Sequence, residues 1–128
     1  RPGNLRDIIA RVNAIRRANS ALQRTDNVRF LELENQQLIA YLKQSNEADN
    51  LILVVVNLDF RNTQSGWVKV PLYDLARPLD AHYRVHDLLG GASYDWTGEW
   101  NYVELDPARM PAHIFRLELP PALERSPA

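Results

Sequence analysis

The feature that most constrains the fold is the run Leu-Ile-Leu-Val-Val-Val-Asn-Leu at residues 51–58, which is apolar at almost every position. Its β-branched residues favour a strand over a helix, and the run is too short to span a membrane. A strand that is apolar on both faces is expected inside a sheet, with other parts of the chain covering both of its sides. Polar segments at residues 44–50 and 59–64 bound the run. We therefore predict that the other strands pair with this segment or lie over it.

Size and composition narrow the class of protein. A chain of 128 residues fits one domain, and its net charge of −1 at pH 7 favours neither a nucleic-acid partner nor an anionic membrane. The absence of Cys excludes disulfides and fits a reducing compartment, so we expect a cytoplasmic location. No apolar run is long enough for a membrane span, and the first residues have no signal-peptide core. Because the sequence begins Arg-Pro-Gly without Met, we expect a piece of a longer protein.

Residues 4–19 are predicted to form one amphipathic helix. Asn4 is a suitable N-cap, and Asp7 stands three residues later, where a capping box places a carboxylate. One apolar stripe follows the helical spacing: Leu5, Ile8, Ile9, Val12 and Ile15. Arg16 falls within this stripe, where it either snorkels at the helix end or makes a buried ion pair or interface contact. An isolated helix of this length is marginal in water, so we expect the stripe to fold back onto the chain or to pair with a second copy.

From residue 27 the apolar pattern changes to a period of two, which is typical of strands. The turn signals are Glu34-Asn35, Gly90-Gly91 and Thr97-Gly98, and Pro71 ends one strand. The predicted strands cover residues 28–33, 37–43, 51–58, 65–70, 83–88, 92–96, 100–105 and 112–119. About eight strands without intervening helices predict a mainly β fold, an antiparallel β-sandwich with Greek-key connections, preceded by the one N-terminal helix.

The ionisable residues do not form a recognisable catalytic or metal-binding pattern. Most of five acidic residues lie at predicted turns or exposed faces, which favours a solvated role: the five are Asp87, Asp95, Glu99, Glu104 and Asp106. His82 and His86 would face the same side of a strand but lie roughly 13 Å apart, too far to share an ion. His113 is expected to pack against the last strand. The sequence predicts no catalytic residue, no metal and no cofactor.

Two stretches, LRDIIARVNAIRRANSAL at residues 5–22 and LILVVVNLD at residues 51–59, together resemble the α-amylase clan, glycoside hydrolase family 13. The first stretch resembles the last helix of the clan's catalytic barrel, which runs into an Asn-Pro-Ala-Leu turn; here Ser20 replaces that proline. The run at residues 51–59 resembles an apolar strand of the clan's C-terminal β-domain, which ends in Asn. A more specific likeness lies at residues 83–118, in the segments VHDLL, YDWTGEWNYVELDP and PAHIFR. These segments resemble the end of the bacterial maltosyltransferases that extend α-1,4-glucans from maltose 1-phosphate; trehalose synthases and branching enzymes end in related domains and stay open as alternatives.

The resemblance implies a parent that is a retaining transferase, with two catalytic carboxylates at one end of an α/β barrel of about 250 residues. This chain lacks that length and pattern, and no position matches the family's catalytic motifs. We therefore expect residues 1–24 to be the last barrel helix, 25–119 the C-terminal β-sandwich and 120–128 a tail. The expected role is non-catalytic: the sandwich packs on the parent's barrel and stabilises it. A self-contained enzyme is disfavoured because the chain lacks a Ser-His-Asp arrangement, metal ligands and a Gly-rich phosphate loop.

The tryptophans allow a second interpretation, a stand-alone glucan-binding module. Trp96 and Trp100 flank one short turn, Trp67 lies on another strand, and Tyr94 and Tyr102 are nearby in sequence. Exposed aromatic rings on a β-sandwich can stack on sugar rings, which makes Trp96, Trp100 and Trp67 the candidate glycan-stacking residues. Aromatic pairs also stabilise the hairpins that carry them, and we favour this structural role.

Overall fold

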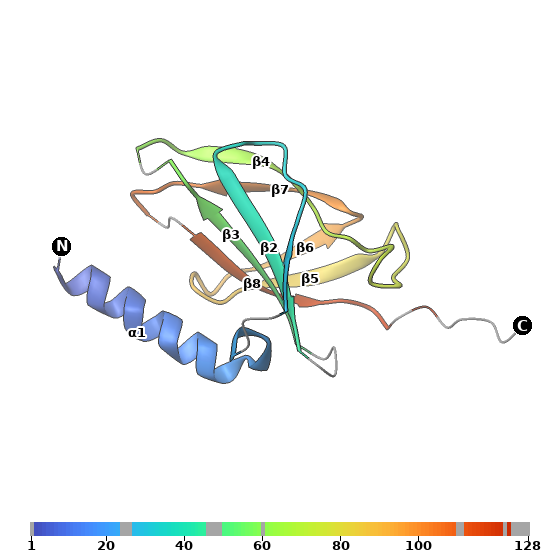
Figure 1. Cartoon of the computed structure of the whole chain (residues 1–128), viewed down its shortest axis with the longest axis horizontal. Coiled ribbons are helices and arrows are strands. Elements are labelled where there is room, and N and C mark those ends of the chain that lie inside the picture. Colours follow the sequence, from blue (N-terminus) through green and yellow to red (C-terminus); the bar gives the residue numbers. More distant parts are fainter. Residues whose placement is uncertain are drawn as a thin grey trace, which may run out of the picture.

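The computed structural model describes residues 2–23, 27–45, 50–59, 61–109, 112–121 and 123, and for residues 2–9 it describes the backbone alone. One α-helix, α1 (Pro2–Ala18), and one 3₁₀ helix, η1 (Ser20–Gln23), precede the strands (Figure 1). The strands are β1 (Val28–Phe30), β2 (Leu38–Gln44), β3 (Leu51–Asn57), β4 (Gln64–Lys69), β5 (His82–Asp87), β6 (Ser93–Thr97), β7 (Trp100–Leu105) and β8 (Ala112–Glu118). Each overlaps one of the strands predicted from the sequence, so the mainly β class is confirmed.

The strands form two antiparallel sheets. The larger has the order β1-β2-β3-β8-β5-β6, and the smaller consists of β4 and β7. In the larger sheet β8 lies between β3 and β5. The last four strands follow a Greek-key path: β5 pairs with β6, β7 crosses to the smaller sheet, and β8 returns to the larger sheet beside β5. Figure 1 shows β4 and β7 side by side on one side of the larger sheet, with α1 on another side near β3 and β8. The predicted antiparallel sandwich is confirmed.

β3, the valine-rich strand, is buried on both faces. It pairs with β2 on one side and β8 on the other. Leu53 and Val55 point into the core between the sheets, where they cluster with Val68 and Leu105 of the smaller sheet. Ile52 points to the opposite face and is fully buried by a second cluster. Burial of such a side chain contributes about 1.5–3 kcal/mol, so the strand predicted to organise the fold also supplies much of its stability.

The second cluster is where α1 meets the larger sheet. Ile15 of α1 and Ala21 of η1 pack with Ile52, and Val12 lies against the same cluster. Nη1 of Arg11 donates a hydrogen bond of 2.8 Å to the carbonyl of Leu89. The second half of the helix therefore folds back onto the sheet, as expected. The side chains of Leu5, Ile8 and Ile9 lie outside the described residues.

One expectation about the helix is corrected, and one of the alternatives for Arg16 is excluded. The helix begins at Pro2, so Asn4 lies within it and is not its N-cap. Proline suits the first turn because its missing N–H would have no intrahelical partner there. Arg16 is exposed, so it makes no buried ion pair.

Polar side-chain contacts join β7 to the larger sheet, and two of them are buried. Nδ2 of Asn57 on β3 donates to the carbonyl of Leu105 at 3.1 Å, and Nδ2 of Asn101 donates to the hydroxyl of Tyr83 on β5 at 2.9 Å. Nε2 of His113 on β8 lies 3.1 Å from the carbonyl of Glu104. Burial raises the pKa of Tyr83. These links fix the side of the sandwich that carries the exposed aromatic residues.

Candidate functional site

The outward face of the smaller sheet carries three exposed aromatic side chains. Trp67 on β4 stands opposite Tyr102 on β7, with ring centroids 5.7 Å apart in an edge-on arrangement, and Trp100 stands opposite Lys69. These three residues are between 39% and 50% exposed, because alternation along the two strands turns their neighbours Val68 and Val103 into the core. We call Trp67, Trp100 and Tyr102 the aromatic face.

Trp96, the third candidate from the sequence, lies elsewhere. It is 9% exposed and packs edge-on against Tyr83 and Phe115, with centroids 6.3 and 5.6 Å apart. Trp96 and Trp100 flank one turn, but that turn leads from the larger sheet to the smaller one, with Gly98 at a φ of 75°. The structure therefore brings Trp67 and Trp100 onto one surface and assigns the ring of Trp96 to the core. A cross-strand pair does form at Trp96, but with Tyr83 of β5.

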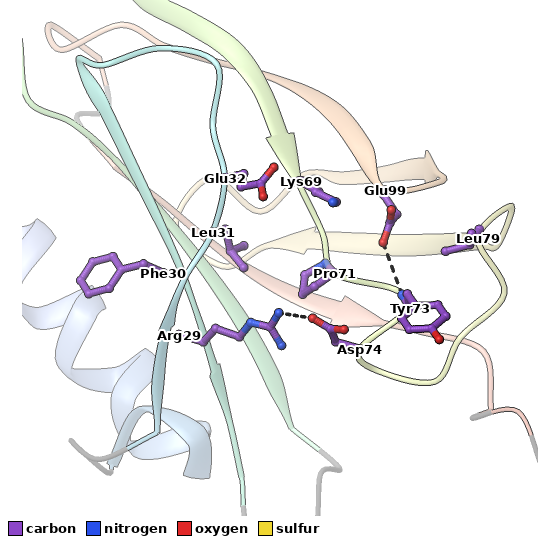
Figure 2. Close-up of a pocket in the computed structure, with 10 residues that line it drawn as sticks. All are labelled: Arg29, Phe30, Leu31, Glu32, Lys69, Pro71, Tyr73, Asp74, Leu79 and Glu99. Carbon is purple, nitrogen blue, oxygen red and sulfur yellow. Dashed lines mark hydrogen bonds and ion pairs between the residues drawn. The ribbon is translucent and has the colours of Figure 1, made fainter. Parts of the chain in front are cut away.

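A groove of about 440 Å³ adjoins the aromatic face (Figure 2). It is lined by Arg29, Phe30, Leu31, Glu32, Lys69, Pro71, Tyr73, Asp74, Leu79 and Glu99. Arg29 and Asp74 form an ion pair, and the amide of Tyr73 donates to Oε2 of Glu99 at 3.3 Å (Figure 2). Lys69 joins the two surfaces, because it lines the groove and is the cross-strand partner of Trp100. Sequence reasoning missed this groove because its walls come from three distant segments.

The groove combines charged groups of both signs with an exposed aromatic ring, Tyr73. Glu32 and Lys69 offer an acceptor and a donor, and a flat ring offers an apolar surface beside them. That mixture suits a neutral ligand with many hydroxyl groups and flat C–H faces. Two of the carboxylates, Asp74 and Glu99, already accept hydrogen bonds from within the chain.

One acidic residue departs from the expected solvated role. Asp87 is buried at the end of β5, where its Oδ1 accepts from the amides of Leu89 at 3.1 Å and Gly90 at 2.9 Å. The glycine turn leaves these two amides without a strand partner, and a carboxylate two or three residues earlier satisfies them. Asp95 and Glu104 are exposed, as expected.

The histidines of β5 face the same side of the larger sheet, as predicted. Nδ1 of His82 lies 2.8 Å from the hydroxyl of Thr97, and Nδ1 of His86 lies 3.0 Å from that of Ser93. Among the described residues, no three His, Asp or Glu side chains are grouped as metal ligands would be. In the same part of the chain, no helix is both long and apolar enough to cross a membrane.

Comparison with known proteins places this geometry in context. A family model described as "GLGE, C-terminal" matches residues 30–117, from the end of β1 nearly to the end of β8. A protein named alpha-1,4-glucan:maltose-1-phosphate maltosyltransferase from Chlorobaculum tepidum is 50% identical over 126 residues, which cover 94% of this chain and 19% of that protein. Proteins with the same name from Salinibacter ruber and Corynebacterium glutamicum are 47% and 43% identical, over 91% and 98% of this chain and 17% and 18% of their own lengths. The chain thus spans less than a fifth of the length of these relatives.

Proposed function

This chain belongs to the GLGE C-terminal family, and from that membership we propose that it is the non-catalytic β-domain of an α-1,4-glucan:maltose-1-phosphate maltosyltransferase. In this proposal the domain packs against the catalytic part of the enzyme and stabilises it. The observation that carries the proposal is that both the family match and the 50% identity to the Chlorobaculum tepidum protein cover the sandwich described above. The names of the relatives favour a maltosyltransferase over a trehalose synthase or a branching enzyme.

The boundaries expected from the sequence belong to this proposal. Residues 1–24 form the last helix of the catalytic part, residues 25–119 form the sandwich, and residues 120–128 form a tail. The contact of Val12 and Ile15 with the larger sheet supports a helix that joins the two parts. We assign the rest of the stripe, Leu5, Ile8 and Ile9, to contact with the catalytic part or, in the chain alone, with a second copy. The absence of Cys supports a cytoplasmic enzyme.

The test is a chimera of the full-length Chlorobaculum tepidum enzyme in which this chain replaces the matched segment. Release of phosphate from maltose 1-phosphate, with glycogen as acceptor, measures maltosyl transfer. We expect the chimera to be active, the enzyme without the segment to lose activity or solubility, and this chain alone to release no phosphate. Transfer by this chain alone, or an inactive and unfolded chimera, would contradict the proposal.

The aromatic face supports a second candidate function, binding of α-glucan by the domain itself. Trp67, Trp100 and Tyr102 present rings on one outward surface beside a polar groove, as a site for a chain of sugar rings requires. The test is migration of this chain in native gels containing amylose or glycogen. Trp100→Ala should reduce retardation and leave the circular dichroism spectrum unchanged. Ile39→Ala, which removes an exposed apolar residue of β2 that does not line this groove, is the control. Equal retardation of wild type and Trp100→Ala would exclude this candidate.

A further inference from the structure

The outward face of the larger sheet is divided into a polar half and an apolar half. At β5, β6 and the end of β8 this face is polar: Nη2 of Arg84 lies 3.5 Å from Oδ1 of Asp95, and Nε2 of the half-buried His86 lies 3.4 Å from Oε1 of Glu118. At β2, β3 and the start of β8 the same face is mostly apolar, with Lys43 of β2 as an exception, and its centre is buried by α1 and η1.

The apolar half extends beyond the part of the sheet that α1 and η1 cover. Val28, Phe30 and Ile39 are exposed large apolar residues, and Phe30 is 70% exposed. Tyr41 and Val56 are half-buried beside them. We call these five residues the open apolar patch: Val28, Phe30, Ile39, Tyr41 and Val56. Strand register makes the patch continuous, since Phe30 stands opposite Tyr41 and Ile39 stands opposite Val56.

The patch adjoins the helix. The rings of Phe30 and Tyr41 meet edge-on with centroids 6.0 Å apart, and Tyr41 also lines a groove of about 210 Å³ that Val12 and Arg16 of α1 border on the other side. Figure 2 shows Phe30 directed away from Pro71 and Tyr73, toward the side on which α1 lies. The patch and α1 therefore share one side of the sandwich.

We propose that the open apolar patch is the surface on which the catalytic part of the same polypeptide docks. This inference rests on the proposed function, in which α1 belongs to the catalytic part, so that this part must stand on the α1 side of the larger sheet. Clustered exposed apolar residues mark interaction sites, and the patch continues the contact that α1 already makes. The polar half at β5 and β6, with the exposed pair of Arg84 and Asp95, stays in water.

The test uses the chimera and this chain alone. Hydroxyl-radical footprinting, read by mass spectrometry, measures the oxidation of each aromatic side chain in both proteins. Phe30 and Tyr41 should lose most of their reactivity in the chimera. Tyr73, which is 77% exposed and lies across the groove of Figure 2 from Phe30, should react equally in both. In the same chimera, Phe30→Ala should lower the melting temperature, while in the chain alone it should change little; Tyr73→Ala is the matched control in both.

The outcomes separate this inference from the proposed function. If Trp67 and Tyr102 are protected instead, and Phe30 reacts equally in both proteins, the docking face is wrong but the domain still docks. If the chimera protects no aromatic residue of this chain, both the docking face and the proposed function are overturned. A fall in melting temperature that is equal for Phe30→Ala and Tyr73→Ala also overturns the docking face.

Discussion

Asn57, the last residue of β3, offers the sharpest test of how the two sheets are joined. Its Nδ2 donates to the carbonyls of Leu105 at 3.1 Å and Asn62 at 3.0 Å, and its Oδ1 accepts from the amide of Asp59 at 2.8 Å. The side chain is 6% exposed, so water cannot replace these contacts. Since Leu105 lies on β7, Asn57→Ala removes a hydrogen bond between the sheets.

The expected loss follows from the contacts. A hydrogen bond contributes about 1 kcal/mol net, and a buried polar group left without a partner costs about 1–3 kcal/mol. Asn62 is exposed, so its carbonyl can turn to water, but the hydrogen bond to the carbonyl of Leu105 is buried and water does not replace it. We expect Asn57→Ala to lower the free energy of unfolding by about 2–4 kcal/mol, a large part of the roughly 5–15 kcal/mol typical of a domain.

Urea unfolding followed by tryptophan fluorescence measures this loss. Asn62→Ala is the control, because the side-chain amide of Asn62 donates an exposed hydrogen bond to the carboxylate of Asp59. This variant should lower the free energy of unfolding by less than about 1 kcal/mol. If Asn57→Ala costs no more than the control, the link to Leu105 does not hold the sheets together.

The variant Asn57→Asp adds a pH test of the same site. The new carboxylate would face two carbonyl oxygens in a buried position, which raises its folded pKa above the unfolded value of about 3.9. The stability deficit relative to wild type should therefore be small below about pH 4 and grow as the pH rises. Unfolding curves at pH 4 and pH 7 measure the difference, and a deficit independent of pH would contradict the assignment.

Three further predictions concern separate parts of the fold. Trp96→Ala should lower the free energy of unfolding by about 3–5 kcal/mol, while Trp67→Ala on the outward face should cost far less, as urea unfolding measures. Tyr83→Phe should cost about 1–2 kcal/mol in the same assay, because its hydroxyl bridges the sheets. Hydrogen bonds from the amide of Arg61 and from neighbouring side chains hold the pKa of Asp59 at about 2, below its usual 3.8. Asp59 thus stabilises the fold above pH 3.8, and that contribution is lost as the pH falls from 3.8 to about 2. Asp59→Asn should therefore make the free energy of unfolding, measured by urea unfolding, depend less on pH in this range.

The strands could be predicted from the sequence because alternation and turn residues are local signals. Val68 and Val70 alternate with Trp67 and Lys69, and the structure buries the valines and exposes Trp67. The apolar run of β3 predicted cover on both faces, and the structure supplies it from the core and from α1. The start of the helix could not be predicted from the sequence, because Asn4 is a suitable N-cap and Pro2 is equally suitable for the first turn.

Strand pairing could not be read from the same pattern. Alternation shows that Tyr94 and Trp96 share a face, but not that β6 pairs with β5 while β7 crosses to the other sheet. That pairing decides the environment of the two tryptophans beside the turn, so Trp96 is in the core and Trp100 is exposed. The groove of Figure 2 was beyond prediction for the same reason, since Arg29, Tyr73 and Glu99 meet only through tertiary contacts.

The two proposed binding surfaces lie on opposite sides of the sandwich. The residues of β4 and β7 that face inward pack on the core side of the larger sheet, so the aromatic face points away from that sheet. The open apolar patch lies on the other side of the larger sheet, with α1. A domain docked through Phe30 would therefore leave Trp67 and Trp100 in water, and the two functions would not compete. Ile39→Ala should leave glucan retardation unchanged, because Ile39 belongs to the open apolar patch and does not line the groove beside the aromatic face. Trp100→Ala should leave the protection of Phe30 in the chimera unchanged. Loss of both properties in either single variant would show that the surfaces are not independent.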